Sequence, residues 1–276
     1  MKTIIIHSSK IPANQQQQII KVLAAQNLQA KANHFRAQTN ADLLTIKNLS
    51  AKLQIDINVI PSNFQFENIK LIISDMDSTL ISIECIDEIA DFVGLKPEVA
   101  KITEKAMRGE LDFSQSLVQR VKLLQGLDVS ALNQVYNERL QLNPGAKKLI
   151  SGCHALGIKF ALVSGGFSFF TEKLKQRLNL DFTLANEFDI VDQKLTGKVK
   201  GKIINAQEKR KFLADICQRL NISPKNSIAI GDGANDLEMM SIASLSVAYC
   251  AKPSVQAQSK VQINYSGLDS TLDFLG

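Results

Sequence analysis

The chain has 276 residues, of which 45% are hydrophobic and 21% charged, a composition typical of a globular protein with a sizeable core. No apolar stretch approaches the ~20 residues that cross a bilayer, and the first apolar run is too short for a secretory signal, which predicts a cytoplasmic protein without membrane contact. The net charge of +5 comes from scattered lysines and arginines, so we expect no nucleic-acid partner.

Residues 1–66 predict a small α/β unit. Residues 3–7 have the pattern of a short strand, residues 15–28 that of a helix, and residues 53–60 form another apolar stretch before a linker at Pro61. The sequence of this unit does not indicate its role. Scaffold, homodimer contact and amino-acid sensor all stay open.

From about residue 67 onward, apolar runs that suit strands alternate with helical patterns. The runs lie at residues 70–75, 158–164, 226–232 and 245–250. This alternation predicts an α/β fold with a parallel, Rossmann-like sheet covered by helices. Ligands of such sheets bind at the carboxyl ends of the strands, so the polar residues that follow the strands are the candidates for a site.

Two segments interrupt this alternation. Roughly sixty residues between the first of these strands and Pro144 have apolar positions at helical spacing, which predicts an inserted helical cap. Residues 188–201 predict a β-hairpin. The predicted organisation is an N-terminal α/β domain at 1–66, a core at 67–85 and 141–276, and a cap at 86–140.

Asp75 and Asp77 follow the first core strand and stand one residue apart, so both side chains can lean to the same side. Two like charges there repel unless a cation lies between them. For an isolated pair, capping of the following helix would explain them equally well. A second acidic cluster, which contains Asp232 and Asp236, also ends a strand, and carboxylate oxygens without His or Cys suit Mg²⁺.

A phosphate group would need hydrogen-bond donors beside these carboxylates. Ser164-Gly165-Gly166 ends another strand, and we expect a helix to begin there, with a hydroxyl and backbone amides that could approach an anion. Lys209 near the start of a further helix could add a point charge. Alone, a Gly pair usually marks a tight turn and a lysine is usually solvated. Only their combination indicates a phosphate site.

In this combination the chain resembles the haloacid dehalogenase superfamily of aspartate-dependent phosphatases, and within it the phosphoserine phosphatase family. Asp75-Met-Asp77-Ser-Thr79 matches the first superfamily motif, Ser164-Gly165 the second, Lys209 the third and Gly231-Asp232-Gly233-Ala-Asn235-Asp236 the fourth. The resemblance spans residues 67–276. Met76 stands where the family commonly has Phe, and we expect this side chain to point into the core.

The narrower resemblance depends on residues of the predicted cap. Glu84 and Arg120 look like the family's partners for a substrate ammonium and carboxylate, and opposite charges suit a zwitterion. Met107 and Phe113 match residues that line the pocket. As isolated residues, the first two would be exposed helix charges and the last two core residues.

The resemblance implies a reaction as well as a fold. Asp75 would attack phosphorus to form an aspartyl-phosphate, and Asp77 would serve as acid and then base. Mg²⁺ would be held by Asp75, the Asp77 carbonyl and Asp232. The predicted substrate is L-phosphoserine, and the reaction is the last step of serine biosynthesis. The other residues that would contact substrate or its phosphoryl oxygens are Ser78, Thr79, Ser164, Gly165, Lys209 and Asn235.

Two alternatives stay open from the sequence. A relative with the same motifs could act on another small phosphomonoester or transfer the phosphoryl group to a second alcohol. The chain could instead be a regulatory binder whose N-terminal unit senses an amino acid while its core is inert, although four intact motifs argue against an inert core.

Overall fold

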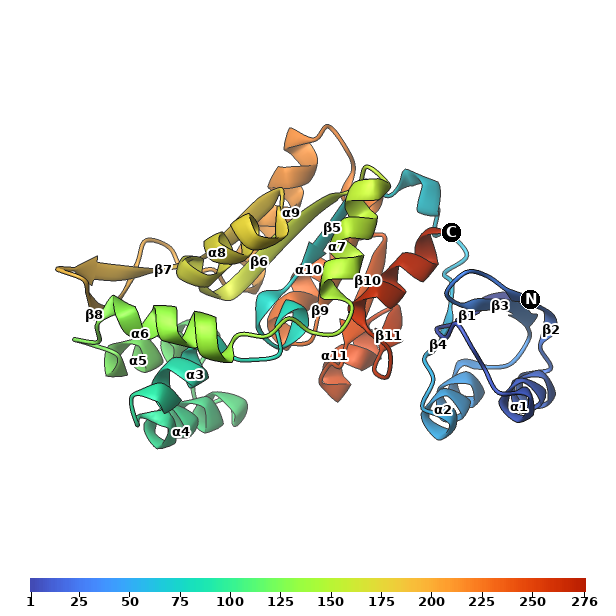
Figure 1. The fold of residues 1–276 in the computed structure, drawn as a ribbon, viewed down its shortest axis with the longest axis horizontal. Helices are drawn as coiled ribbons and strands as arrows, with labels where there is room; N and C mark the ends of the chain where they lie inside the picture. The colour runs from blue at the N-terminus through green and yellow to red at the C-terminus, as the bar shows by residue number, and fades with distance from the viewer.

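The computed structural model describes residues 1–276 apart from the side chain of Met107, and it has three parts in a row (Figure 1). A seven-stranded sheet with helices on both faces lies in the middle, a four-stranded N-terminal unit lies at one end, and a group of helices inserted after the first strand of the large sheet lies at the other. None of the helices in the described chain is long and apolar enough to span a membrane.

The large sheet has the strand order β11-β10-β9-β5-β6-β7-β8, and all neighbours are parallel except β7 and β8. The predicted fold class is therefore confirmed. Parallel strands buried on both faces explain why the runs in the sequence were almost continuously apolar. The elements of this core are β5 (Leu71–Ser74), α7 (Ala146–Ala155), β6 (Lys159–Phe167), α8 (Ser168–Leu178), β7 (Phe182–Val191), β8 (Lys194–Lys200), α9 (Ala206–Arg219), β9 (Ser227–Gly231), α10 (Leu237–Ile242), β10 (Leu245–Tyr249), α11 (Pro253–Gln258) and β11 (Val261–Ile263).

Successive residues of the central strand β5 point to opposite faces of the sheet, and each face packs on its own helices. Ile72 belongs to the cluster that includes Phe170 of α8 and residues of α7. Leu71 and Ile73 belong to the cluster that includes Leu213 of α9 and residues of α10. Because helices cover both faces, polar groups can reach this sheet only at the strand ends.

The inserted helices are α3 (Cys85–Phe92), α4 (Lys96–Met107), α5 (Phe113–Leu123) and α6 (Val129–Gln134), here called the cap. The chain leaves the core at Ile81 and returns at Leu142, and these two residues form an antiparallel bridge. The side-chain amide of Asn143 donates to the carbonyls of Thr79 and Ile81 at 2.8 and 3.1 Å. The exit of the cap thus holds the loop that follows β5.

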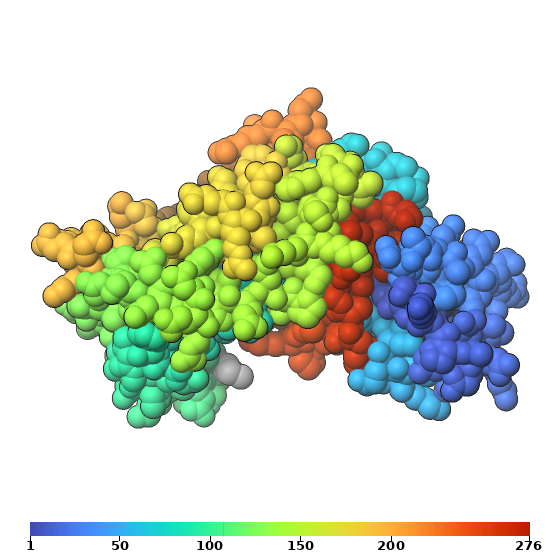
Figure 2. All heavy atoms as spheres, viewed as in Figure 1, coloured from blue at the N-terminus to red at the C-terminus, as the bar shows by residue number. Residues whose placement is uncertain are grey.

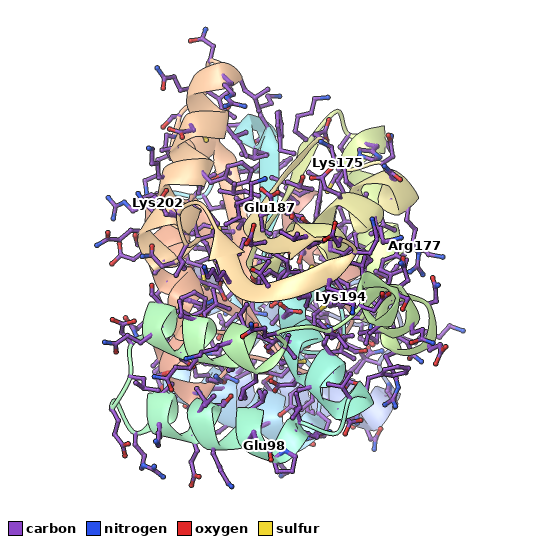
Figure 3. All side chains as sticks on the ribbon, turned by 90° about the vertical axis from the view of Figure 1, so that its left-hand side faces the viewer. Glu98, Lys175, Arg177, Glu187, Lys194 and Lys202 are labelled. Atoms are coloured by element: carbon purple, nitrogen blue, oxygen red, sulfur yellow. The ribbon has the colours of Figure 1, made fainter. Side chains whose placement is uncertain are left out.

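The cap is also bonded to the β7–β8 hairpin, whose tight turn at Asp192 and Gln193 has positive φ at both residues. The backbone N–H of Gly126 donates to Leu195 O, and that of Leu195 donates to Leu127 O, both at 2.8 Å. Figure 3 views this end of the molecule, with Glu187 and Lys194 labelled on the hairpin and Glu98 on the cap helices stacked below it. The predicted hairpin is present, and it braces the cap.

The N-terminal unit is an antiparallel sheet of order β2-β3-β1-β4 with two helices, and it has its own apolar core. The predicted helix at 15–28 was too long, because the chain turns at Ala24 in the left-handed conformation and continues as a strand. The second helix and the strands at 26–30 and 35–39 were not predicted, and the residues of these two strands are mostly polar. The elements are β1 (Lys2–Ile6), α1 (Ala13–Leu23), β2 (Gln26–Ala30), β3 (Phe35–Thr39), α2 (Leu43–Leu53) and β4 (Ile57–Val59).

This unit is docked on the C-terminal segments of the core, where blue and red atoms meet in Figure 2. The buried Asp56 carboxylate accepts hydrogen bonds from the backbone N–H groups of Asn264, Tyr265 and Ser266 at 2.8–3.0 Å. Asn58 bonds the backbone N–H and carbonyl of Gln262 in β11. These directed bonds fix the orientation of the unit on the edge of the large sheet.

Candidate active site

The first two aspartates lie in the loop that leaves β5. The backbone N–H of Asp75 continues the sheet by donating to Ile230 O at 3.0 Å, and the residue is 5% exposed. Ser78 has φ of +57°, so the chain reverses immediately after Asp77. This turn lets Asp77 Oδ1 accept from the Cys85 N–H at 3.0 Å, while Oδ2 lies 3.4 Å from Ser164 Oγ. The intervening Met76 is fully buried, as predicted.

Lys209 is the cation that faces these charges. It comes from the first turn of α9, which the Asn205 side chain caps, and its side chain is fully buried. Its ammonium donates to Asp75 Oδ1 and, at 2.7 Å, to Asp236 Oδ1. These two buried carboxylates raise the pKa of Lys209 above its usual range, against the lowering effect of burial. Lys209 is therefore always charged.

The same edge of the sheet carries more negative charge than one lysine neutralises. Carboxylate oxygens of Asp75, Asp232 and Asp236 all lie within 4.8 Å of one another. Burial, together with the neighbouring carboxylates, raises the pKa of Asp75 well above its usual range and that of Asp232 to about 6. Thr79 Oγ1 donates to Asp232 at 2.9 Å and Gly233 N–H to Asp236 at 3.0 Å, which orients both groups.

Ser164, Gly165 and Gly166 lie beside Asp77, but not at a helix N-terminus. The prediction that a helix begins there was wrong, because β6 continues to Phe167 and α8 starts only at Ser168. The backbone is instead held from both sides. The Gly166 N–H donates to Ser164 Oγ, and the Asn186 side chain donates to Gly165 O, both at 2.7 Å. A side chain at Gly166 would clash, since its Cβ would lie 2.6 Å from Asp77 Oδ2.

A cavity of about 960 Å³ lies between this edge of the sheet and the cap. Asp75 and Asp77 line it from the core, and Glu84, Phe113 and Arg120 line it from the cap side. Phe113 lies over the glycine motif, because a Cβ on Gly165 would be 2.6 Å from its ring. Asn235 lines the same cavity. The structure thus brings the motifs at the strand ends and the charged cap residues to one open cavity.

Glu84 connects the two sides of the cavity. Its carboxylate accepts from Ser78 Oγ at 2.8 Å, directly after the aspartate loop. Desolvation by the surrounding protein, and then the charge of Asp77, raise the pKa of Glu84 to about 7. A desolvated carboxylate beside another negative charge is stabilised by a cationic partner.

Residues 69–243 match the model of the haloacid dehalogenase-like hydrolases. The chain belongs to this family. A phosphoserine phosphatase of Polaromonas is 51% identical over 79% of this chain and 95% of its own length. The unliganded structure of a probable phosphoserine phosphatase from Vibrio cholerae matches 99% of this chain and 86% of its own, with a TM-score of 0.87 and 37% identity. A substrate-bound phosphoserine phosphatase structure matches 75% of this chain and 99% of its own, with a TM-score of 0.71 and 38% identity.

The donor set of this haloacid dehalogenase-like site suits a hard divalent cation. The clustered ligands are carboxylate oxygens, with no His or Cys among them in the described residues. The pKa values of Asp75 and Asp232 are both raised because these groups are buried beside like charges, which the Lys209 ammonium offsets only in part. A metal ion fits here because it would remove that repulsion.

Several residues that the sequence did not single out also line the cavity. They include Asp87, Thr103 and Ser116 of the cap helices and Lys252, which follows β10. Of these residues, Asp87 could have been found from helical periodicity, because it lies three residues after Glu84 and so faces the same side. Met107, predicted to line the pocket, has its side chain outside the part of the chain that the structure describes.

Proposed function

We propose that the chain is a magnesium-dependent phosphatase that hydrolyses L-phosphoserine to L-serine and phosphate, the last step of serine biosynthesis. One observation carries this proposal: a single cavity is lined by the buried aspartate pair and by a carboxylate and a guanidinium from the cap side. The aspartates suit phosphoryl transfer, whereas Glu84 and Arg120 suit the ammonium and carboxylate of an amino acid.

Asp75 is the nucleophile in this proposal. Its carboxylate oxygen forms a bond to phosphorus while the bond from phosphorus to the serine oxygen breaks, which leaves an aspartyl-phosphate. The Lys209 ammonium donates to Oδ1 and so directs this carboxylate, and its charge opposes the rise in the Asp75 pKa that burial causes. Water then attacks phosphorus and releases the Asp75 carboxylate and inorganic phosphate.

Asp77 is the acid and then the base. Burial raises the pKa of Asp77, which favours a carboxyl that holds a proton and can give it to the leaving serine oxygen. In the second half of the reaction the same carboxylate takes a proton from the attacking water. The Cys85 N–H at 3.0 Å and the Ser164 hydroxyl hold both of its oxygens in place.

Mg²⁺ would be held by the Asp75 carboxylate, the Asp77 backbone carbonyl and Asp232, and it would neutralise the charge between an anionic nucleophile and an anionic phosphate. The phosphoryl oxygens would be bound by Ser78, Thr79, Ser164, the Gly165 backbone, Lys209 and Asn235. Phe113 covers this position and limits the access of water.

Phosphate release from L-phosphoserine, measured with Mg²⁺ and again in excess EDTA, tests the proposal directly. We expect turnover only with the metal. Asp75→Asn should lower kcat by at least about 10³-fold with an unchanged circular dichroism spectrum, because an amide is a poor nucleophile at phosphorus. Retained activity in this variant would rule out Asp75 as nucleophile.

The alternative substrate within the same family is another small phosphomonoester, with or without transfer to a second alcohol. A substrate panel separates the two cases. Arg120→Ala should lose activity on L-phosphoserine far more than on an aryl phosphate that lacks a carboxylate. Equal losses on both substrates would favour the alternative, and a new phosphomonoester formed in the presence of an added alcohol would identify a phosphotransferase.

A further inference from the structure

Three polar atoms in the cap are buried without a hydrogen-bond partner among the described residues. They are Asp87 Oδ1 on α3, Thr103 Oγ1 on α4 and Arg120 Nε on α5, and all three residues line the cavity of the proposed active site. Buried polar atoms are nearly always paired, since an unmade hydrogen bond is costly. Three such atoms from three helices around one cavity indicate that their hydrogen bonds form only when a ligand occupies the cavity.

Asp87 and Arg120 have opposite charges and face the same space, but they form no salt bridge within 4.0 Å in the described structure. They are nevertheless close enough to interact. Burial raises the pKa of the Asp87 carboxyl, and the charge of Arg120 is the largest effect that opposes this rise. In the ligand-free cap, the Asp87 carboxylate and the Arg120 guanidinium are therefore separated, although direct contact would stabilise both.

The geometry of a guanidinium explains how a ligand could bring them together. Arginine has five N–H donors in a planar fork, and a carboxylate that binds two of them leaves the others for a second acceptor. An arginine held by a second carboxylate loses its freedom to rotate away from the substrate. Asp87 offers such an acceptor, because Oδ1 is buried and has no other partner in the described chain.

We propose that Asp87 is a positioning residue for substrate recognition: its carboxylate accepts from the Arg120 guanidinium when substrate is bound and orients it toward the substrate carboxylate. This inference depends on the proposed function, in which Arg120 binds that carboxylate. Glu84 remains the partner of the ammonium, so the two cap carboxylates have different roles. Asp87 is thus expected to affect only substrates that have a carboxylate.

The test compares two substrates that differ in that one group. L-phosphoserine has an ammonium and a carboxylate, whereas phosphoethanolamine has only the ammonium. Asp87→Asn should raise KM for L-phosphoserine about ten- to hundredfold, the range expected for a hydrogen bond between charged groups, and lower kcat by much less. The kcat/KM for phosphoethanolamine should change by less than about threefold, since no carboxylate is involved.

Asp91→Asn is the matched control, because it makes the same chemical change on the same helix α3. Asp91 lies outside the cavity and forms ion pairs with Lys96 and Arg139 at the surface. This variant should have wild-type kinetics on both substrates. Asp87→Asn should also leave the thermal midpoint of the ligand-free protein unchanged or raise it, since it removes the charge of a half-buried carboxylate whose Oδ1 has no partner.

A double-mutant cycle completes the test. In an Arg120→Gln background, Asp87→Asn should add less than about a twofold change in KM, because the group it positions is gone. Equal losses on both substrates, or full additivity with Arg120→Gln, would overturn the inference, since Asp87 would then contact the ammonium or support the fold. If the wild-type chain fails to hydrolyse L-phosphoserine at all, the proposed function itself is wrong, a result that these comparisons distinguish from a failure of Asp87 alone.

Discussion

Lys209→Met removes the only buried cation among the described residues that contacts Asp75 and Asp236, and its effect on stability can be estimated. The side chain is fully buried, and methionine has a similar length without the charge. Two buried carboxylates are left without their shared partner. Breaking a buried ion pair from one side costs about 3–5 kcal/mol, so we expect the free energy of unfolding to fall by that amount at pH 8 in EDTA.

The pH dependence of this loss identifies its cause. A carboxyl whose pKa is raised in the folded state binds its proton more tightly there than in the unfolded chain, so its ionisation destabilises the fold as pH rises. Burial already raises the pKa of Asp75 well above its usual value, and removal of the Lys209 charge raises it further. The difference between wild type and Lys209→Met should therefore be largest at pH 8 and shrink as pH falls toward 5.

Urea unfolding followed by far-UV circular dichroism gives the free energies, since the chain has no tryptophan. Lys211→Met on the same helix is the matched control, because Lys211 is exposed and its loss should change stability by less than about 0.5 kcal/mol. A loss below about 1 kcal/mol at pH 8, or a loss of equal size at pH 5 and pH 8, would refute the reasoning.

Two further variants test the cavity. The pKa of Glu84 is raised to about 7 in the free enzyme. The kcat/KM for L-phosphoserine should therefore fall as pH drops below 7, because the Glu84 carboxylate becomes protonated and no longer attracts the substrate ammonium. Glu84→Gln should have a lower plateau and lack this dependence in a pH–rate profile, and an unchanged acidic limb would assign it to another group. Gly166→Ala should lower kcat about 10- to 100-fold while KM stays within about threefold, because the new Cβ would lie 2.6 Å from Asp77 Oδ2 and displace the acid/base group. Wild-type kcat in this variant, measured as phosphate release, would show that Asp77 tolerates the shift.

The motif residues other than Lys209 could be located from the sequence because each follows or ends a recognisable strand. Asp75, Ser164 and Asp232 come directly after or at the end of apolar runs, and the carboxyl ends of parallel strands meet at one edge of a sheet. Their convergence therefore follows from topology alone. The helical cap could be anticipated in the same way, since its apolar periodicity differs from that of the strands.

The secondary-structure predictions were wrong where the local sequence pattern favours one conformation and tertiary contacts impose another. The helix expected at Gly166 begins two residues later, because β6 continues its pairing with β7 as far as Phe167. The mostly polar strands of the N-terminal unit gave no apolar run to detect. Their conformation is decided by pairing, since β2 pairs with β3 and β3 pairs with the buried strand β1.

The sequence by itself determined the kind of chemistry, since aspartates and small residues at strand ends, with a lysine at the start of a helix, can meet only at one sheet edge. Only the tertiary structure decided which polar groups are left unpaired there. Asp87, Thr103 and Arg120 lie on three separate helices, and their isolation from partners depends on how those helices pack around the cavity. The packing of these helices depends on many contacts between residues far apart in the sequence, so no short stretch of sequence predicts it.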